Sequence, residues 1–148
     1  MNSLAPSPAT GMQIGVVVST YNSNITRRLL EGSLQTLAAA GWTEAHVVQV
    51  QVPGAWELPL AAKRLTEQPH IQGVVVLGAV IRGETTHDQH INRSVSCALM
   101  ELMMATGKPI GFGLLTCNTL EQAIHRAGGN VGNKGCETAE AVLAMLAQ

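Results

Sequence analysis

Four apolar runs of strand length alternate along the chain with segments that have helical periodicity. The runs cover residues 13–19, 46–52, 73–81 and 110–116, and the third reads GVVVLGAVI without a polar residue. Runs that are apolar throughout are typical of strands buried on both faces of a parallel sheet, because a half-exposed strand alternates between apolar and polar positions. We therefore expect four parallel strands with helices between them.

The intervening segments predict helices over residues 25–40, 56–67, 87–106, 118–127 and 135–146. Ser23 or Asn24 is expected to cap the first helix, and Gly41 follows its end. Asn118 with Glu121 three residues later resembles a capping box for the fourth. The segment GGNVGNKG predicts a glycine-rich break before the last helix.

This order of elements predicts a three-layer α/β/α sandwich around a four-stranded parallel sheet. We place a single domain at residues 13–148, without internal repeats. Residues 1–12 are rich in Pro, Ser and Ala and are expected to form a flexible N-terminal arm. This arm lacks the basic start and apolar stretch of a secretory signal.

Composition narrows the class of protein further. The chain has 148 residues, of which 46% are hydrophobic, and a formal net charge of −1. That charge argues against a surface that binds nucleic acid, and no apolar run has the length of a transmembrane helix. Cys97, Cys117 and Cys136 show no metal-type spacing. Their odd number favours reduced thiols and a cytoplasmic location, and Cys97 is expected in the core.

Polar side chains gather where the expected strands end, which is the edge where such sheets bind ligands. Tyr21 and Asn22 follow the first strand, and Trp56 and Glu57 follow the second. Tyr21 could stack on a ring or simply pack in a turn. Glu57 could accept hydrogen bonds from a ligand or stabilise the helix N-terminus. The sequence leaves both alternatives open.

The third strand ends in the densest polar run, RGETTH, at residues 82–87. A glycine allows the backbone to approach a ligand closely, and two threonines precede a helix whose free N–H groups can bind an anion. His87, in the first turn, could transfer protons there. The alternative is a capped helix with a solvated histidine, and we favour the functional reading. His87, Asp88 and His90 lack a further ligand at zinc spacing, so no metal site is predicted.

Arg126 and Lys134 flank the glycine-rich segment 128–135. Both cations suit a phosphate group, although the GxxxxGK[ST] pattern of a phosphate-binding loop is absent. In isolation they could equally be ordinary surface cations.

Taken together, these motifs resemble the 6,7-dimethyl-8-ribityllumazine synthase family. The resemblance rests on Tyr21–Asn22, VPGAWELPLAA, GVVVLGAVIRGETTH, PIGFGLLT, EQAIHRAGGNVGNKG and AEAVLAML, and spans about residues 13–146. It implies a flavodoxin-like fold and the penultimate step of riboflavin biosynthesis. In that step 5-amino-6-(D-ribitylamino)uracil condenses with 3,4-dihydroxy-2-butanone 4-phosphate, giving the lumazine, phosphate and water. No cofactor is implied.

The resemblance also implies roles for individual residues. His87 would transfer protons. The pyrimidine and its ribityl chain would be held by Tyr21, Asn22, Ala55, Trp56, Glu57, Val80, Ile81, Phe112 and Lys134. The butanone phosphate would be held by Gly83, Glu84, Thr85, Thr86 and Arg126. Phe112 and Arg126 would come from a neighbouring subunit, and Glu137 could join Lys134.

The family's assembly is a homopentamer, and in many members twelve pentamers close into an icosahedral shell. The sequence does not choose between them, nor does it show whether riboflavin synthase is carried as cargo. Asp88-Gln89-His90 replaces an aromatic-acidic-aromatic run common in the family, while His125 and Asn130 replace an acidic residue and a lysine. Two other functions stay open: a non-catalytic lumazine- or flavin-binding shell protein, and a riboflavin synthase of the archaeal type.

Overall fold

A four-stranded parallel sheet forms the centre of the computed structural model, which describes residues 7–83, 85 and 87–148. Its strands are β1 (Gln13–Ser19), β2 (Val47–Val52), β3 (Ile71–Ile81) and β4 (Ile110–Cys117), in the order β2-β1-β3-β4. β1 and β3 are central, and β3 pairs with β4 from Val74–Ile110 to Ile81–Cys117. The predicted sheet is confirmed, and its order of strands is flavodoxin-like.

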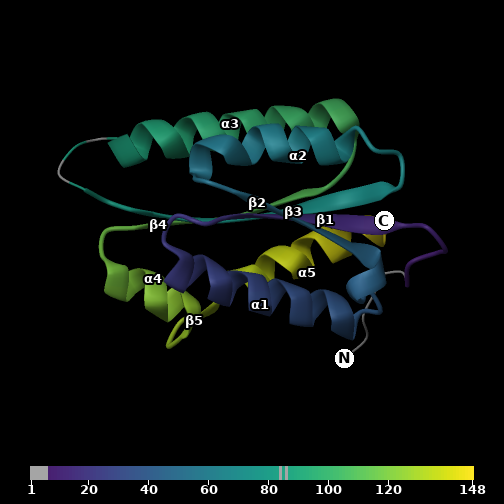
Figure 1. The fold of residues 1–148 in the computed structure, drawn as a ribbon, viewed down its shortest axis with the longest axis horizontal. Helices are drawn as coiled ribbons and strands as arrows, with labels where there is room; N and C mark the ends of the chain where they lie inside the picture. The colour runs from purple at the N-terminus through teal and green to yellow at the C-terminus, as the bar shows by residue number, and fades with distance from the viewer. Residues whose placement is uncertain (1–6, 84, 86) are drawn as a thin grey trace.

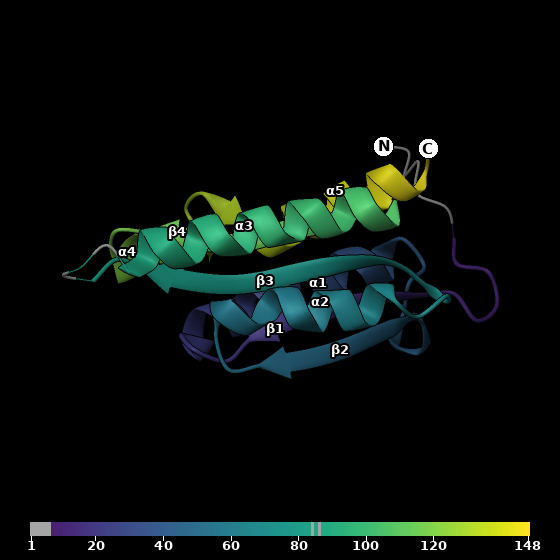
Figure 2. The same cartoon turned by 90° about the horizontal axis from the view of Figure 1, so that it is seen from above.

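Helices cover both faces of this sheet, which confirms the three-layer sandwich (Figure 1). The helices are α1 (Ser23–Ala39), α2 (Leu58–Thr66), α3 (His87–Thr106), α4 (Leu120–Arg126) and α5 (Lys134–Leu146). α2 and α3 lie over one face, and α1, α4 and α5 lie over the other (Figure 1). The view from above shows α3 as the longest helix, running along β3 and β4 (Figure 2).

The strands divide their apolar side chains between two cores. Val16, Val75 and Leu77 belong to the core beneath α1 and α5, whereas Val17 and Val76 belong to the core beneath α2 and α3. Successive strand residues point to opposite faces, so a strand that is apolar at every position can fill both cores. This is the physical reason why the continuous runs predicted the architecture.

Several local expectations were wrong. The N-cap position of α1 is Asn22 rather than Ser23 or Asn24; it takes the left-handed conformation at φ 61° and its side chain makes no capping hydrogen bond. The cap of α4 is Thr119, whose hydroxyl accepts from the Gln122 N–H. The capping contact therefore lies one residue beyond the expected Asn118–Glu121 pair, because Asn118 still belongs to the turn that leaves β4.

The segment before α2 and the glycine-rich segment also differ from expectation. Residues Ala55–Glu57 form a 3₁₀ turn, and α2 starts only at Leu58, with a proline in its first turn. The glycine-rich segment is an antiparallel hairpin of β5 (Ala127–Gly129) and β6 (Gly132–Asn133). Gly128 and Gly132 take positive φ there, which explains the glycines.

Cys97 is exposed on α3, so its expected place in the core was wrong. The helix buries Val95 and Leu99 instead, and Cys97 lies between them on a different side. Among the described residues, none of the helices has the length and apolar character that a membrane-spanning segment needs. A short 3₁₀ turn, Glu44–His46, leads into β2.

Candidate active site

A cavity of about 370 Å³ lies at the carboxyl ends of β1, β2 and β3. It is lined by Tyr21, Gly54, Ala55, Trp56, Ala79, Val80, Ile81, Gly83, Thr85, His87, Asp88 and Ile91. These residues come from the turn after β1, the 3₁₀ turn after β2, the end of β3 and the first turns of α3. The cavity therefore forms where parallel α/β sheets bind ligands.

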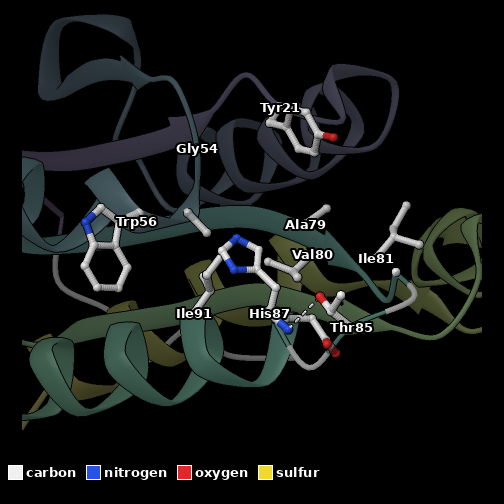
Figure 3. Close-up of a pocket in the computed structure, with 12 residues that line it drawn as sticks. Tyr21, Gly54, Trp56, Ala79, Val80, Ile81, Thr85, His87 and Ile91 are labelled. Atoms are coloured by element: carbon white, nitrogen blue, oxygen red, sulfur yellow. Dashed lines mark hydrogen bonds between the residues drawn. The ribbon is translucent and has the colours of Figure 1, made fainter.

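Two aromatic side chains border this cavity and are largely open to solvent. Tyr21 is 72% exposed and Trp56 is 63% exposed. Figure 3 shows both rings beside the cavity, with the His87 imidazole between the turn at Gly54 and the strand at Val80. Such flat faces suit a planar heterocycle, because a ring gains both apolar contact and stacking geometry from them.

His87 begins α3 and is itself exposed. Its backbone N–H donates to the Thr85 hydroxyl over 3.3 Å, so a threonine satisfies one of the free donors of the helix start (Figure 3). This contact fixes the short loop relative to the helix. The free N–H groups at the start of this 20-residue helix can bind an anion, and the histidine beside them can move a proton.

Asn22 is held in place by a contact that the sequence did not indicate. Its Nδ2 donates to the Ala79 carbonyl over 2.9 Å, which joins the turn after β1 to the end of β3. The residue therefore connects two edges of the cavity, although it does not line the cavity itself. Its side-chain nitrogen is engaged within the protein.

Glu57 has a similar structural contact. Its Oε1 accepts the Gly54 N–H over 2.9 Å and so closes the turn after β2. Glu57 also does not line the cavity. Of the two alternatives that the sequence left open for Glu57, the structural contact is present.

Three residues of the predicted site lie away from this cavity. Phe112 on β4, which is 42% exposed, pairs with Val76 on β3. Val80 pairs with Thr116, which lies four residues after Phe112 on β4. Phe112 therefore lies about 13 Å upstream of the cavity edge at ~3.3 Å per residue.

Arg126 ends α4 and Lys134 begins α5, in the helix layer opposite α3 (Figure 1).

Glu84 and Thr86, two further members of the predicted site, lie outside the described residues. The cavity also includes residues that the sequence analysis did not assign to it, namely Gly54, Ala79, Asp88 and Ile91. Ile91 stands one turn after His87, a spacing that could have indicated it. No set of three metal-binding side chains is found in the part of the chain that the structure describes.

The fold and the cavity define a class of protein: a small α/β protein with a pocket for a ring-bearing ligand beside a helix N-terminus and a histidine. Comparison with known proteins makes this specific. Residues 11–148 match the family of 6,7-dimethyl-8-ribityllumazine synthase, and the chain belongs to that family.

Curated relatives carry the same name. The 6,7-dimethyl-8-ribityllumazine synthase of Rhodopirellula baltica is 51% identical over 134 residues, covering 90% of this chain and 86% of the relative. That of Thermus thermophilus is 46% identical over 93% of this chain and 88% of the relative. The enzyme of the same name from Syntrophus aciditrophicus is 44% identical over 93% of this chain and 90% of the relative.

Proposed function

We propose that this protein is an enzyme that condenses 5-amino-6-(D-ribitylamino)uracil with 3,4-dihydroxy-2-butanone 4-phosphate. The products are 6,7-dimethyl-8-ribityllumazine, phosphate and water, and the reaction is the penultimate step of riboflavin biosynthesis. The observation that carries this proposal is the family match over residues 11–148 joined to a cavity that holds His87, Tyr21 and Trp56 together.

The pyrimidine substrate fits the wall made by the turns after β1 and β2. Tyr21 and Trp56 would face its ring, and the backbone of Val80 and Ile81 would border it. Ala55, Asn22 and Glu57 would hold the ring and ribityl chain, with Asn22 and Glu57 using the polar atoms that their internal contacts leave over. This arrangement is supported by the position of five of these seven residues on the cavity wall.

The butanone phosphate fits the loop between β3 and α3. Gly83 and Thr85 line the cavity, and Glu84 and Thr86 are proposed to complete this loop. The free N–H groups at the start of α3 attract an anion. Arg126 would add a bidentate contact to the phosphate, which is the geometry that a guanidinium provides.

The chemistry requires several proton transfers in one place. The amine adds to the ketone and loses water to form an imine, phosphate is eliminated, and ring closure releases a second water. His87, at the cavity wall, would take up and return these protons. Because amines and ketones condense readily, holding both substrates together would supply much of the acceleration.

A complete site needs a second copy of the chain. Phe112, Arg126 and Lys134 do not line the cavity of their own chain. We propose that a neighbouring subunit presents them, within a homopentamer that could assemble further into a 60-subunit shell, with riboflavin synthase as a candidate cargo. Phe112 is exposed, as a residue that reaches a neighbour must be.

Two further proposals concern the whole chain. Residues 1–12 would form an arm outside a single domain at 13–148, and the protein would act in the cytoplasm, where its three free cysteines stay reduced.

The test is formation of the lumazine by the purified protein, followed by absorbance above the uncatalysed background. Catalysed formation that saturates in both substrates is expected. Turnover of the lumazine alone, without the butanone phosphate, would indicate a riboflavin synthase instead. Ligand binding at the background rate would indicate a binding or shell protein.

A further inference from the structure

Asp88 is unusual both in the sequence and in its surroundings. It is the only aspartate among the 148 residues. It lies in the first turn of α3, where His87, Gln89 and His90 are exposed, yet Asp88 itself is only 9% exposed. A charged side chain is seldom buried to this degree without a partner.

The carboxylate lacks such a partner within the described residues. Its Oδ1 is enclosed and forms no hydrogen bond, and neither ion pair found in the described chain involves Asp88. The start of α3 offsets part of the cost of the negative charge, because the helix dipole is positive there. The dipole does not supply the missing donor, and an unsatisfied buried acceptor remains destabilising.

No hydrogen bond joins Asp88 to the next turn of α3 within the described residues. Asn92, four residues later on the same side of the helix, also has a buried Oδ1 without a partner. Asn92 does not line the cavity, whereas Asp88 does. Among the described surroundings of Asp88, the cavity is the place where a ligand could bring a donor, and the terminal torsion of an aspartate is soft enough to turn an oxygen toward it.

We propose that Asp88 binds the substrate by accepting a hydrogen bond from an N–H or hydroxyl group of the ribitylamino-uracil. This inference rests on the proposed function. The phosphate group is not its partner, because a carboxylate repels a phosphate, and the butanone phosphate has only one hydroxyl to donate. The pyrimidine, in contrast, offers amine, ring N–H and ribityl hydroxyl donors. Asp88 thereby becomes a specificity-determining residue beside His87.

Steady-state kinetics of Asp88→Leu and Asp88→Asn test this role. Leu removes both acceptors at similar size, so the KM for the pyrimidine is expected to rise about ten- to hundredfold, the range of a hydrogen bond to a charged group. Asp88→Asn keeps one acceptor, so its KM for the pyrimidine should lie between those of the wild type and Asp88→Leu. The KM for the butanone phosphate should change less than about twofold. Asn92→Ala, one turn away and outside the cavity, is the matched control and should leave both KM values unchanged.

Thermal unfolding separates this role from a structural one. Replacing an unsatisfied buried acceptor by an apolar group is close to neutral or stabilising, so Asp88→Leu should keep or raise Tm. A fall in Tm together with an unchanged ratio of the two KM values would overturn the proposal. It would mean that Asp88 supports the fold, for example through a neighbouring copy.

The single aspartate also permits a direct measurement on the wild-type protein. Cell-free synthesis with [4-¹³C]aspartate labels this carboxyl alone, and infrared difference spectra then report its hydrogen bonding. The carboxylate band is expected to shift when the ribitylamino-uracil is added and to stay unchanged with inorganic phosphate. No shift with the pyrimidine would overturn the proposal. A shift in a protein without turnover would uphold the contact and refute the synthase function.

Discussion

At the scale of single residues, the aromatic side chains separate into one that is buried and three that are not. Trp42 is 1% exposed, whereas Tyr21, Trp56 and Phe112 are all exposed. A chain with so few rings would gain stability by burying them, because each ring removes a large apolar area from water. Their exposure fits contact with a ligand or with another copy of the chain.

His87→Ala tests proton transfer. We expect kcat to fall about a hundredfold, at the low end of what acid–base groups contribute, while the affinity for the pyrimidine stays nearly unchanged. Initial rates and a binding titration measure the two effects. His90→Ala is the control, because His90 is exposed and lies on the same helix outside the cavity. An unchanged kcat in His87→Ala would remove this histidine from the mechanism.

Arg126→Ala tests the phosphate contact. Loss of a guanidinium from a phosphate should raise the KM for the butanone phosphate about ten- to a hundredfold and change the KM for the pyrimidine far less. Arg27→Ala, which removes an exposed cation from α1, should leave both values at wild-type level. If Arg126→Ala raised both KM values equally, Arg126 would have no specific role toward phosphate.

The sequence could indicate most of these residues but not their contacts. Gly83, Thr85 and His87 follow a long apolar strand, so the rule for parallel sheets placed them at the cavity. The internal bonds of Asn22 and Glu57 depend on how closely two turns approach, which no local pattern encodes. Asp88 escaped notice as a cavity residue because an acidic residue in a first helical turn is common and usually solvated.

At the scale of elements, the side chain of Asn133 hydrogen-bonds the hairpin β5–β6 to the first helix. Asn133 Oδ1 accepts the backbone N–H groups of Gly135 and Cys136, and its Nδ2 donates to the Arg28 carbonyl over 3.1 Å. Asn133 thus caps α5 and fixes α5 against α1. Arg126 and Lys134 flank this hairpin, so Asn133 lies between the two cations in the sequence.

Asn133→Ala should lower the free energy of unfolding by about 1–2 kcal/mol, since a helix cap and a second hydrogen bond are lost together. Asn133→Asp keeps the cap and loses the bond to Arg28, so its free energy of unfolding should fall by less than that of Asn133→Ala. Thermal or denaturant unfolding measures both. Equal losses for the two variants would show that the cap contributes nothing.

The elements themselves were largely predictable. β1 and α3 begin and end at the predicted residues. Their apolar runs and the Gly or Pro residues that end them depend only on neighbouring positions in the sequence. The hairpin β5–β6 was missed because its strands are only three and two residues long and mostly glycine. Such strands carry no apolar pattern. Cys97 was misplaced because an apolar residue in a helix can lie on its exposed side.

At the scale of the whole molecule, the cavity and the cations belong to opposite layers of the sandwich. His87 starts α3 above the sheet, and Arg126 ends α4 below it (Figure 1). Neither layer alone presents both the proton-transfer group and the guanidinium to one substrate pair. In the ring of copies that we propose, a head-to-tail interface would let each chain present one of these surfaces to the next.

The central claim is that the cavity of one copy and the cations of its neighbour form one active site. It is tested by unfolding and reassembling His87→Ala and Arg126→Ala together in equal amounts, with each variant alone as the control. A shared site predicts that about a quarter of the interfaces combine an intact His87 with an intact Arg126. About that fraction of wild-type turnover should therefore return at a butanone phosphate concentration near the wild-type KM, where each variant alone is slow. Turnover in the mixture equal to the mean of the two separate variants would contradict the shared site.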